Sequence, residues 1–179
     1  ADTDRADAEL EAIAQLSRSS LAEVRSTVTR LRIPDFSGEI QASERALQTA
    51  SIAAKLPDAE RALSAVGVNS SLFSWVLREA VTNIVRHSQA GFCEVRVSNT
   101  GLEILDNGVG IPTEYAAGSG IKGMKSRVES AGGTLVIEDA PARWLRAHPA
   151  GSGAADIRGT RLRVSMDGNT AEIEPSGDT

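Results

Sequence analysis

The chain has 179 residues and a mass of 18.8 kDa, which fits one domain or one domain with an appendage. Its 19 basic and 24 acidic residues give a formal charge of −5, which argues against a nucleic-acid or anionic-membrane surface as its main function. A single cysteine, Cys93, excludes an internal disulfide, and two histidines, His87 and His148, leave little scope for a histidine-rich metal centre.

The first predicted element is a long helix from about Ala6 to Ile33, in which apolar residues recur at steps of three and four. Pro34 ends this helix, and residues 35–38 are expected to form a linker. A helix with one apolar stripe should pack on another helix or subunit. The sequence begins at Ala1 rather than Met and shows no signal peptide or membrane span, so we expect a fragment or processed chain whose span, if any, lies upstream.

Residues 39–166 are predicted to form one domain that mixes helices and strands. Helices are expected at 42–50, 72–87 and 124–131, with strands at 51–56, 93–97, 102–105, 134–138 and 160–165. Asn99-Thr100-Gly101 predicts a tight hairpin between two of these strands. Helices with mostly antiparallel strands in this order predict an α+β fold, a two-layer sandwich of helices on a sheet.

Two segments are predicted to lack regular structure. Residues 140–158 contain two prolines, Trp144 and a Gly-Ser-Gly run, and are expected to form a long solvated loop. Residues 167–179 are polar and are expected to form a disordered tail.

The helix predicted over 72–87 carries one row of side chains that changes from apolar to polar. At about 100° per residue, Glu79, Asn83 and His87 continue a row that begins with Leu72 and Val76. A carboxylate, an amide and an imidazole beside an apolar face cost free energy unless a partner satisfies them. A cleft that holds a ligand, a metal ion or ordered water would do so. The alternative is a boundary row at the sheet edge, with solvated polar tips.

Two glycine-rich segments follow the predicted hairpin. Asp106–Gly110 comes directly after a strand, where Asn-Gly by itself is a common turn. Gly118–Met124 opens a helix, and glycines before a helix N-terminus let backbone N–H groups converge on an anion. Lys122 would add a positive charge there. A lone glycine motif also fits an ordinary flexible loop, so it is the succession of the two segments that indicates a phosphate site.

Four motifs in chain order, spread over about 80 residues, resemble the ATP-binding domain shared by sensor histidine kinases, gyrase-type ATPases and Hsp90-like chaperones, known as the Bergerat or GHKL fold. Glu79-x-x-x-Asn83-x-x-x-His87 resembles the N box of that family. The two glycine boxes are matched by Asp106-Asn107-Gly108-x-Gly110 and by Gly118-x-Gly120-Ile121-x-Gly123-Met124, and the closing Gly-Thr motif by Gly159-Thr160.

The subtype is similar to the NarL/DesK-type kinases. Leu21–Arg25 with Leu31-Arg32 resembles the second dimerisation helix of that subfamily, and Arg78–His87 is close to its N box. The short lid, residues 111–117, also suits it. The resemblance therefore divides the chain into a partial dimerisation region over 1–33, a catalytic domain over 39–166 and a tail over 167–179.

The resemblance implies a role for each motif residue. Asp106 would accept a hydrogen bond from the adenine amino group, and Thr160 would support the adenine through water. Asn83 would bind Mg²⁺, and Glu79 would orient a metal-bound water or assist proton transfer. Further nucleotide contacts are implied for Arg86, His87 and Lys122 at the phosphates and for Gly108 and Gly110 at the base. Gly118, Gly120 and Gly123 would form the hinged lid, and Ile121 and Met124 of the same motif are further nucleotide-binding candidates.

The function implied by the resemblance is that of the ATP-binding catalytic domain of a bacterial, cytoplasmic-facing sensor histidine kinase. The complete kinase would be a homodimer that transfers the γ-phosphoryl group of ATP to a histidine on a dimerisation helix, and from there to a response regulator. His87 belongs to the N box and His148 to a predicted loop, so neither resembles the acceptor histidine. We therefore expect this chain to bind Mg-ATP without phosphorylating itself.

Two other functions fit the same motifs. An anti-sigma-factor-type kinase, which phosphorylates Ser or Thr on a partner, needs no acceptor helix, although the stripe over 6–33 favours the sensor kinase. A gyrase- or chaperone-like ATPase would use Glu79 as the general base for water, but the sequence lacks the extra transducer domain of such machines.

Overall fold

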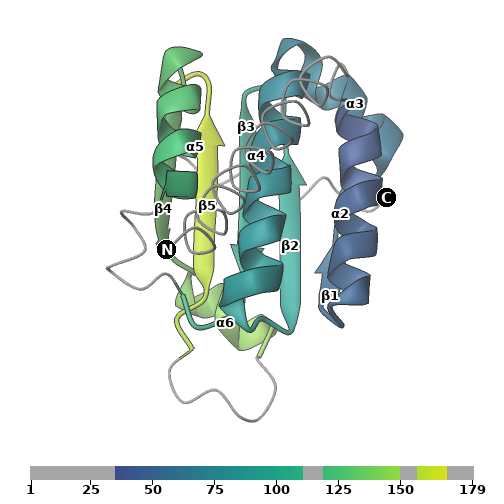
Figure 1. The fold of residues 1–179 in the computed structure, drawn as a ribbon, viewed down its shortest axis with the longest axis vertical. Coiled ribbons are helices and arrows are strands. Elements are labelled where there is room, and N and C mark those ends of the chain that lie inside the picture. The colour runs from purple at the N-terminus through teal and green to yellow at the C-terminus, as the bar shows by residue number, and fades with distance from the viewer. Residues whose placement is uncertain (1–34, 111–118, 150–156, 169–179) are drawn as a thin grey trace, which may run out of the picture. The chain divides into compact units, whose positions relative to one another are not determined.

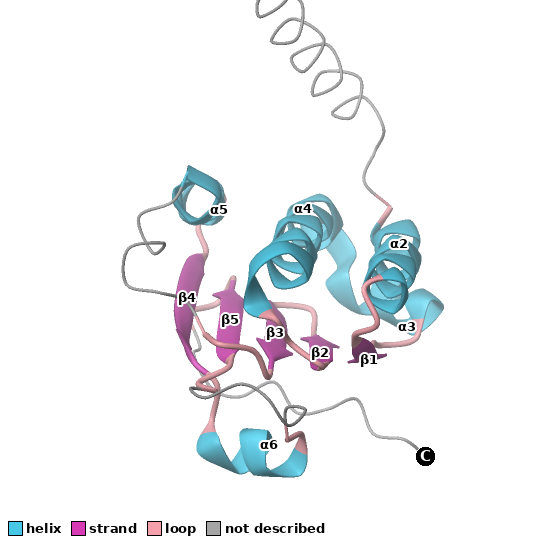
Figure 2. Ribbon diagram, turned by 60° about the horizontal axis from the view of Figure 1, so that its bottom comes forward, coloured by secondary structure: helices cyan, strands magenta, loops and turns pink. Residues whose placement is uncertain are grey.

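The computed structural model describes residues 35–110, 119–149 and 157–168. A five-stranded sheet carries helices on one face in front of the strands (Figure 1), while a single short helix, α6, lies on the opposite face (Figure 2). The helices are α2 (Phe36–Thr49), α3 (Ala59–Val66), α4 (Ser70–Asn83), α5 (Ser119–Ser130) and α6 (Ala142–Ala147). The strands are β1 (Ala53–Lys55), β2 (Phe92–Val97), β3 (Gly101–Asp106), β4 (Thr134–Asp139) and β5 (Thr160–Ser165).

The sheet has the strand order β1-β2-β3-β5-β4. Only β1 and β2 run parallel among the described pairs, and the other three pairs are antiparallel. Because side chains alternate along a strand, the sheet has two different faces. Apolar side chains such as Val95, Ile104 and Leu162 point to the helices, whereas charged ones such as Arg96 and Glu103 point to the other face. These observations confirm the predicted α+β sandwich.

Helix α4 supplies the centre of the core. Phe73, Val76 and Leu77 are fully buried, as the apolar face of the predicted helix requires. Phe36 of α2 meets Phe73 edge to face, with ring centroids 6.5 Å apart. At about 25 cal/mol per Å² of apolar surface removed from water, such large buried side chains contribute most of the stabilisation of the helix layer.

The prediction of a linker over residues 35–38 is wrong, because residues 36–38 belong to helix α2. Helix α2 begins at Phe36, six residues before the predicted start, and the carboxylate of Asp35 caps it by accepting a hydrogen bond from Ser37 N at 3.1 Å. Burial of Phe36 against α4 and this cap outweigh the poor helix propensity of Gly38.

Helix α3 was not predicted from the sequence. It is short, and Asp58 caps it by accepting from Arg61 N at 3.0 Å.

Two other predicted helices have different bounds. Helix α5 starts at Ser119, five residues before the predicted position, and so includes Gly120 and Gly123. The helix predicted over 72–87 starts at Ser70 and changes at Ile84 into a π-helical turn, η2 (Ile84–Ser88), which ends at Gln89 in the left-handed conformation. The strand predictions are confirmed within two residues. The predicted helix over 6–33 and the tail beyond residue 168 lie outside the described residues.

The prediction of a solvated loop over 140–158 is wrong for its first half. Residues 142–147 form α6, and Trp144 is only 6% exposed because it packs on Leu105 and Phe92. The Trp144 indole N–H donates to Glu94 at 2.6 Å, and the ring of His148 stacks on Phe92 with centroids 4.4 Å apart. Burial of this aromatic cluster fixes the segment on the sheet.

Candidate functional site

Asp106 ends β3 on the helix-facing side of the sheet and is 3% exposed. Its carboxylate accepts a hydrogen bond from Gly108 N at 2.9 Å and another from the Thr160 hydroxyl. Among the described residues, no cation forms an ion pair with it. Burial raises the pKa of Asp106 to about 6, although its hydrogen bonds with Gly108 and with the side chain and backbone of Thr160 act to lower it. A buried carboxylate without a cation has remaining acceptor capacity, which suits a ligand N–H donor.

Thr160 begins β5 and lies directly opposite Asp106 in the sheet. The sequence reasoning expected it to act on the base through water. The structure adds a direct contact, because the Thr160 hydroxyl hydrogen-bonds to the Asp106 carboxylate. Thr160 therefore holds that carboxylate in one orientation.

The loop after Asp106 packs on the π-helical turn that ends α4. Ser88 O accepts a hydrogen bond from Val109 N at 2.9 Å, and a side chain at Gly108 would overlap the same carbonyl group. Only glycine allows the two backbones to approach this closely. π-Helical turns are often found at functional sites. Here the turn connects the helix that carries Glu79 and Asn83 to the loop that follows Asp106.

Glu79 and Asn83 lie one turn apart on α4, and both side chains are half-buried. Arg86 and His87 follow in the π-helical turn and are exposed. Glu79 faces the start of α5, since a Cβ atom at Gly120 would stand 2.5 Å from Glu79 Oε1. The absence of a side chain at Gly120 leaves room for this carboxylate beside the first turn of α5.

The other residues of the second glycine box divide into buried and exposed positions on α5. Met124 is 1% exposed in the core, and Ile121 packs against that core. Lys122 and Gly123 are exposed. Gly118 and the predicted lid lie outside the described residues. Met124 and Ile121 therefore anchor the helix, while Lys122 remains available to a ligand.

Asn107 is the residue that sequence reasoning missed. Its side chain is 1% exposed, and its carbonyl oxygen accepts from Gly91 N at 2.9 Å and from Phe92 N at 2.8 Å. Its amide nitrogen donates to His148 O at 3.0 Å. Asn107 thus joins the end of β3, the start of β2 and the end of α6. Asn-Gly in a sequence indicates a turn. No local signal shows that the Asn107 side chain also bonds to residues far away in the sequence.

The candidate magnesium ligands on α4, Glu79 and Asn83, are oxygen donors. Among the described residues there is no group of three or more His, Cys, Asp or Glu side chains that could hold a metal ion. Mg²⁺ does not require such a cage, because it retains several waters and is bound by one or two protein oxygens together with phosphates. The Asn83 amide and the Glu79 carboxylate, one turn apart, fit this requirement.

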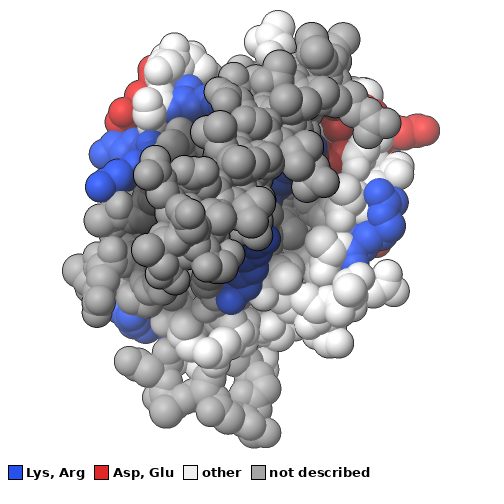
Figure 3. Space-filling model, viewed as in Figure 1, with Lys and Arg blue, Asp and Glu red and all other residues white. Residues whose placement is uncertain are grey.

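The described basic residues on the helix face are scattered. Among the described residues, Lys and Arg occur in separate groups on this face rather than in one basic stripe (Figure 3). None of the described helices combines the length and apolar character needed to cross a membrane.

Comparison with known proteins identifies this arrangement. Residues 69–170 match the family described as histidine kinase-, DNA gyrase B-, and HSP90-like ATPase. The chain is similar to the sensor histidine kinases DesK and YvfT of Bacillus subtilis (strain 168), with 32% identity over 143 residues and 30% over 142 residues. These matches cover 76% and 77% of this chain but 39% and 38% of the two kinases, so the chain spans about two fifths of their length.

Solved structures with a similar arrangement include two histidine kinases. The cytoplasmic segment of QseC is 15% identical with a TM-score of 0.47, and the match covers 83% of this chain and 91% of that one. AdeS of Acinetobacter baumannii is 19% identical with a TM-score of 0.44, over 73% of this chain and 62% of that one. The family assignment rests on the sequence matches.

Proposed function

Because the chain belongs to the family of histidine kinase-, DNA gyrase B- and HSP90-like ATPases, we propose that its described domain is the ATP-binding catalytic domain of a two-component sensor histidine kinase. It would transfer the γ-phosphoryl group of ATP to a histidine on a dimerisation helix. A response regulator would then receive the group. The similarity to two sensor histidine kinases supports this choice over the other branches of the family.

The observation that carries the proposal is the buried carboxylate of Asp106, which has no cation beside it among the described residues. Burial makes the charge of this carboxylate costly. An adenine amino group that donates a hydrogen bond to it would offset part of that cost. Guanine presents a carbonyl oxygen at the corresponding position of its ring and would meet the carboxylate with like partial charge. The carboxylate therefore selects the base, while Gly108 lets the loop lie close to it.

The phosphate end of the nucleotide would lie toward Glu79, Asn83 and the start of α5. Asn83 would hold Mg²⁺ by its amide oxygen, and Glu79 would orient a water on the ion or assist proton transfer. Magnesium supplies charge neutralisation at the phosphates when bound. Arg86, His87 and Lys122 are exposed, and they would contact the same phosphates. Phosphoryl transfer depends mainly on positioning and charge neutralisation, which these groups provide.

The remaining parts of the proposal concern the chain as a whole. Residues 1–33 would be the second dimerisation helix, and the complete kinase would be a homodimer with a four-helix bundle. The domain would act on the cytoplasmic side of the membrane, where ATP is available. The two relatives, DesK and YvfT, are sensor histidine kinases by name, and this supports the assignment of a response regulator as partner.

The test is phosphorylation of a helical dimerisation fragment that carries an acceptor histidine. With γ-³²P-ATP and Mg²⁺, the fragment should gain label that is lost in acid, because phosphohistidine is acid-labile. The Asn83→Ala variant should not transfer label, and the chain alone should remain unlabelled. Acid-stable label on serine or threonine would instead support an anti-sigma-factor-type kinase. Rapid phosphate release by the chain alone, abolished by Glu79→Gln, would support an ATPase.

A further inference from the structure

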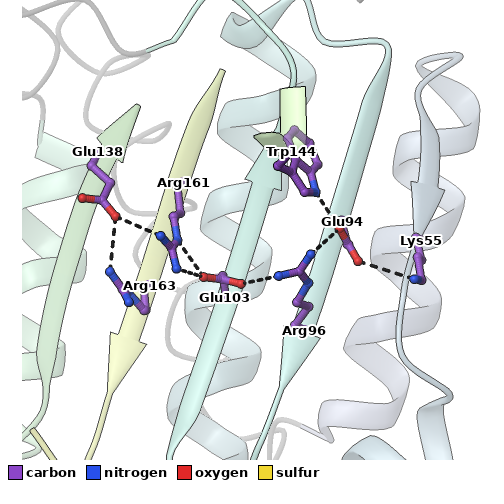
Figure 4. A network of polar contacts seen from close by, with 8 residues as sticks. All are labelled: Lys55, Glu94, Arg96, Glu103, Glu138, Trp144, Arg161 and Arg163. Carbon is purple, nitrogen blue, oxygen red and sulfur yellow. Dashed lines mark hydrogen bonds and ion pairs between the residues drawn. The ribbon is translucent and has the colours of Figure 1, made fainter. Parts of the chain in front are cut away.

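The segment that connects β4 to β5 places α6 on the sheet face opposite α4 (Figure 2). Figure 4 shows how this helix is attached: the Trp144 indole N–H donates to Glu94 at 2.6 Å, and Glu94 also pairs with Arg96 at 2.9 Å. Trp144 packs on Leu105, which directly precedes Asp106 in β3. Helix α6 is therefore fixed behind the strand end that carries the candidate adenine-binding carboxylate.

The first connection from α6 to the loop after Asp106 runs through His148. Its backbone oxygen accepts a hydrogen bond from Asn107 Nδ2 at 3.0 Å. Its ring stacks on Phe92, with centroids 4.4 Å apart and planes inclined by 9°, and Phe92 N donates to Asn107 Oδ1 at 2.8 Å. The stack and the two hydrogen bonds form a closed set of contacts, so the His148 ring fixes the carbonyl group that holds Asn107.

The second connection runs through Gly159, the residue before β5. Gly159 N donates to Gly108 O at 2.8 Å. A Cβ atom at Gly159 would stand 2.5 Å from Asp106 O and 2.9 Å from Leu145 Cδ2. Gly159 is thus enclosed between the backbone of the candidate site and the Leu145 side chain of α6, with no room for a side chain of its own.

Both connections end on groups that orient the Asp106 carboxylate. Gly108 N donates to that carboxylate at 2.9 Å, and Thr160, which follows Gly159, hydrogen-bonds to it as well. Because packed interiors transmit strain, a displacement of α6 would move these two donors. Recognition groups have to be held within about 0.5 Å of their productive geometry, so such a displacement would weaken binding of the base.

We propose that α6 and His148 position the base end of the site: from the opposite face of the sheet they hold the loop after Asp106, so that its carboxylate meets adenine in one geometry. This inference rests on the proposed function, in which Asp106 accepts the adenine amino group. Leu145 and His148 are positioning residues, because they act through the loop and lie on the face away from the nucleotide. The phosphate end lies on α4, so the base should be affected more than the phosphates.

Residues of this segment allow a matched set of variants in the full chain. His148→Ala removes the ring that stacks on Phe92, whereas His148→Phe retains an aromatic ring there. Leu145→Ala removes the side chain beside Gly159 and tests the second connection separately. Arg146→Ala changes an exposed residue of α6 and is the control. Circular dichroism verifies that each variant is folded at the temperature of the measurement.

Calorimetric titration of Mg-ADP and Mg-GDP measures base recognition as the ratio of the two Kd values. His148→Ala should weaken ADP roughly fivefold and GDP by less than about twofold, so the preference for ADP falls. Leu145→Ala should act in the same direction, while His148→Phe and Arg146→Ala should keep the wild-type preference. A purely structural role would lower the stability of the variants without changing the preference of the folded chain.

Hydrogen exchange of the chain without nucleotide is an independent measurement. The exchange rates at Gly108 N and Gly159 N, relative to that at Ala80 N in α4, should rise at least roughly fivefold in His148→Ala but not in His148→Phe. The proposal is overturned if His148→Ala keeps the wild-type preference for ADP or the wild-type exchange ratio, or if His148→Phe behaves as His148→Ala does. A wild-type chain that bound no ADP would refute the proposed function, and the exchange ratio would still decide whether α6 holds this loop.

Discussion

Buried carboxylates on the two faces of the sheet have opposite surroundings. Asp106, on the helix side, is 3% exposed and accepts hydrogen bonds from neutral groups alone among the described residues. Glu94, on the other face and 3% exposed, contacts Arg96, Lys55 and Trp144. Burial therefore raises the pKa of Asp106 to about 6, while the pKa of Glu94 lies below its ordinary value.

The difference separates a functional carboxylate from structural ones. A buried carboxylate that forms ion pairs with neighbouring cations is part of the fold. Its removal leaves those cations buried without a counter-charge. A buried carboxylate without a neighbouring cation lowers the stability of the fold. Such a residue is typical of a functional site, where a bound ligand supplies the missing partner. The two faces should therefore respond to substitution in opposite directions, which the following predictions examine in order of expected size.

The largest loss of stability is expected on the charged face. Glu103→Gln leaves Arg96 and Arg161 without their shared carboxylate and should lower the free energy of unfolding by about 3–5 kcal/mol. Urea unfolding followed by circular dichroism measures this. The control Glu129→Gln removes a carboxylate that is 56% exposed and that pairs, within the described ranges, only with Lys125, so it should change stability by less than about 0.5 kcal/mol. Similar values for the two variants would refute the structural role of Glu103.

A smaller loss is expected at Asn107, which connects the two faces. Asn107→Ala removes the acceptor of two backbone N–H groups and the donor to His148 O, and should cost about 2–3 kcal/mol. Hydrogen exchange should report faster exchange at Gly91 N and Phe92 N, with little change in the centre of α4. Exchange that increases equally over the whole domain would contradict a local clamp.

The smallest effect, of opposite sign, is expected for Asp106→Asn. Since the folded pKa is about 6 and the ordinary value is 3.8, the folded chain holds this proton more tightly than the unfolded chain. Ionisation therefore costs stability as the pH rises through this window, and the full cost is present above it. Asp106→Asn should be more stable than the wild-type chain by about 1–2 kcal/mol at about pH 7.5, and the gain should disappear at about pH 4. A gain that is independent of pH would have another cause.

The spacing of apolar residues and the positions of the glycines predict most of the helix-facing half of this domain from the sequence. The apolar face of α4 and the alternating strands β2, β3 and β5 follow from local patterns, and these elements position Asp106, Asn83 and Glu79. The early start of α2 could have been predicted from Asp35, which precedes Phe36 as a typical N-cap residue.

The other face of the sheet could not be predicted in the same way. Trp144 lies between two prolines in a segment rich in glycine, and its partners Glu94 and Leu105 are distant in sequence. The alternating charges of Glu94 and Arg96 indicate a solvated strand face when the sequence is considered alone. Their burial depends on tertiary contacts, because cross-strand pairs and α6 together remove them from water. The same applies to Asn107, whose three partners come from two other segments.

The central claim is that Asp106 recognises adenine, and calorimetric titration of ADP with Mg²⁺ into the folded chain tests it most directly. The wild-type chain should bind ADP at least roughly tenfold more tightly than GDP, and Asp106→Ala should lose that preference together with most of the affinity for ADP. Equal affinity of the wild-type chain and Asp106→Ala for ADP, or no heat from the folded wild-type chain, would contradict the account.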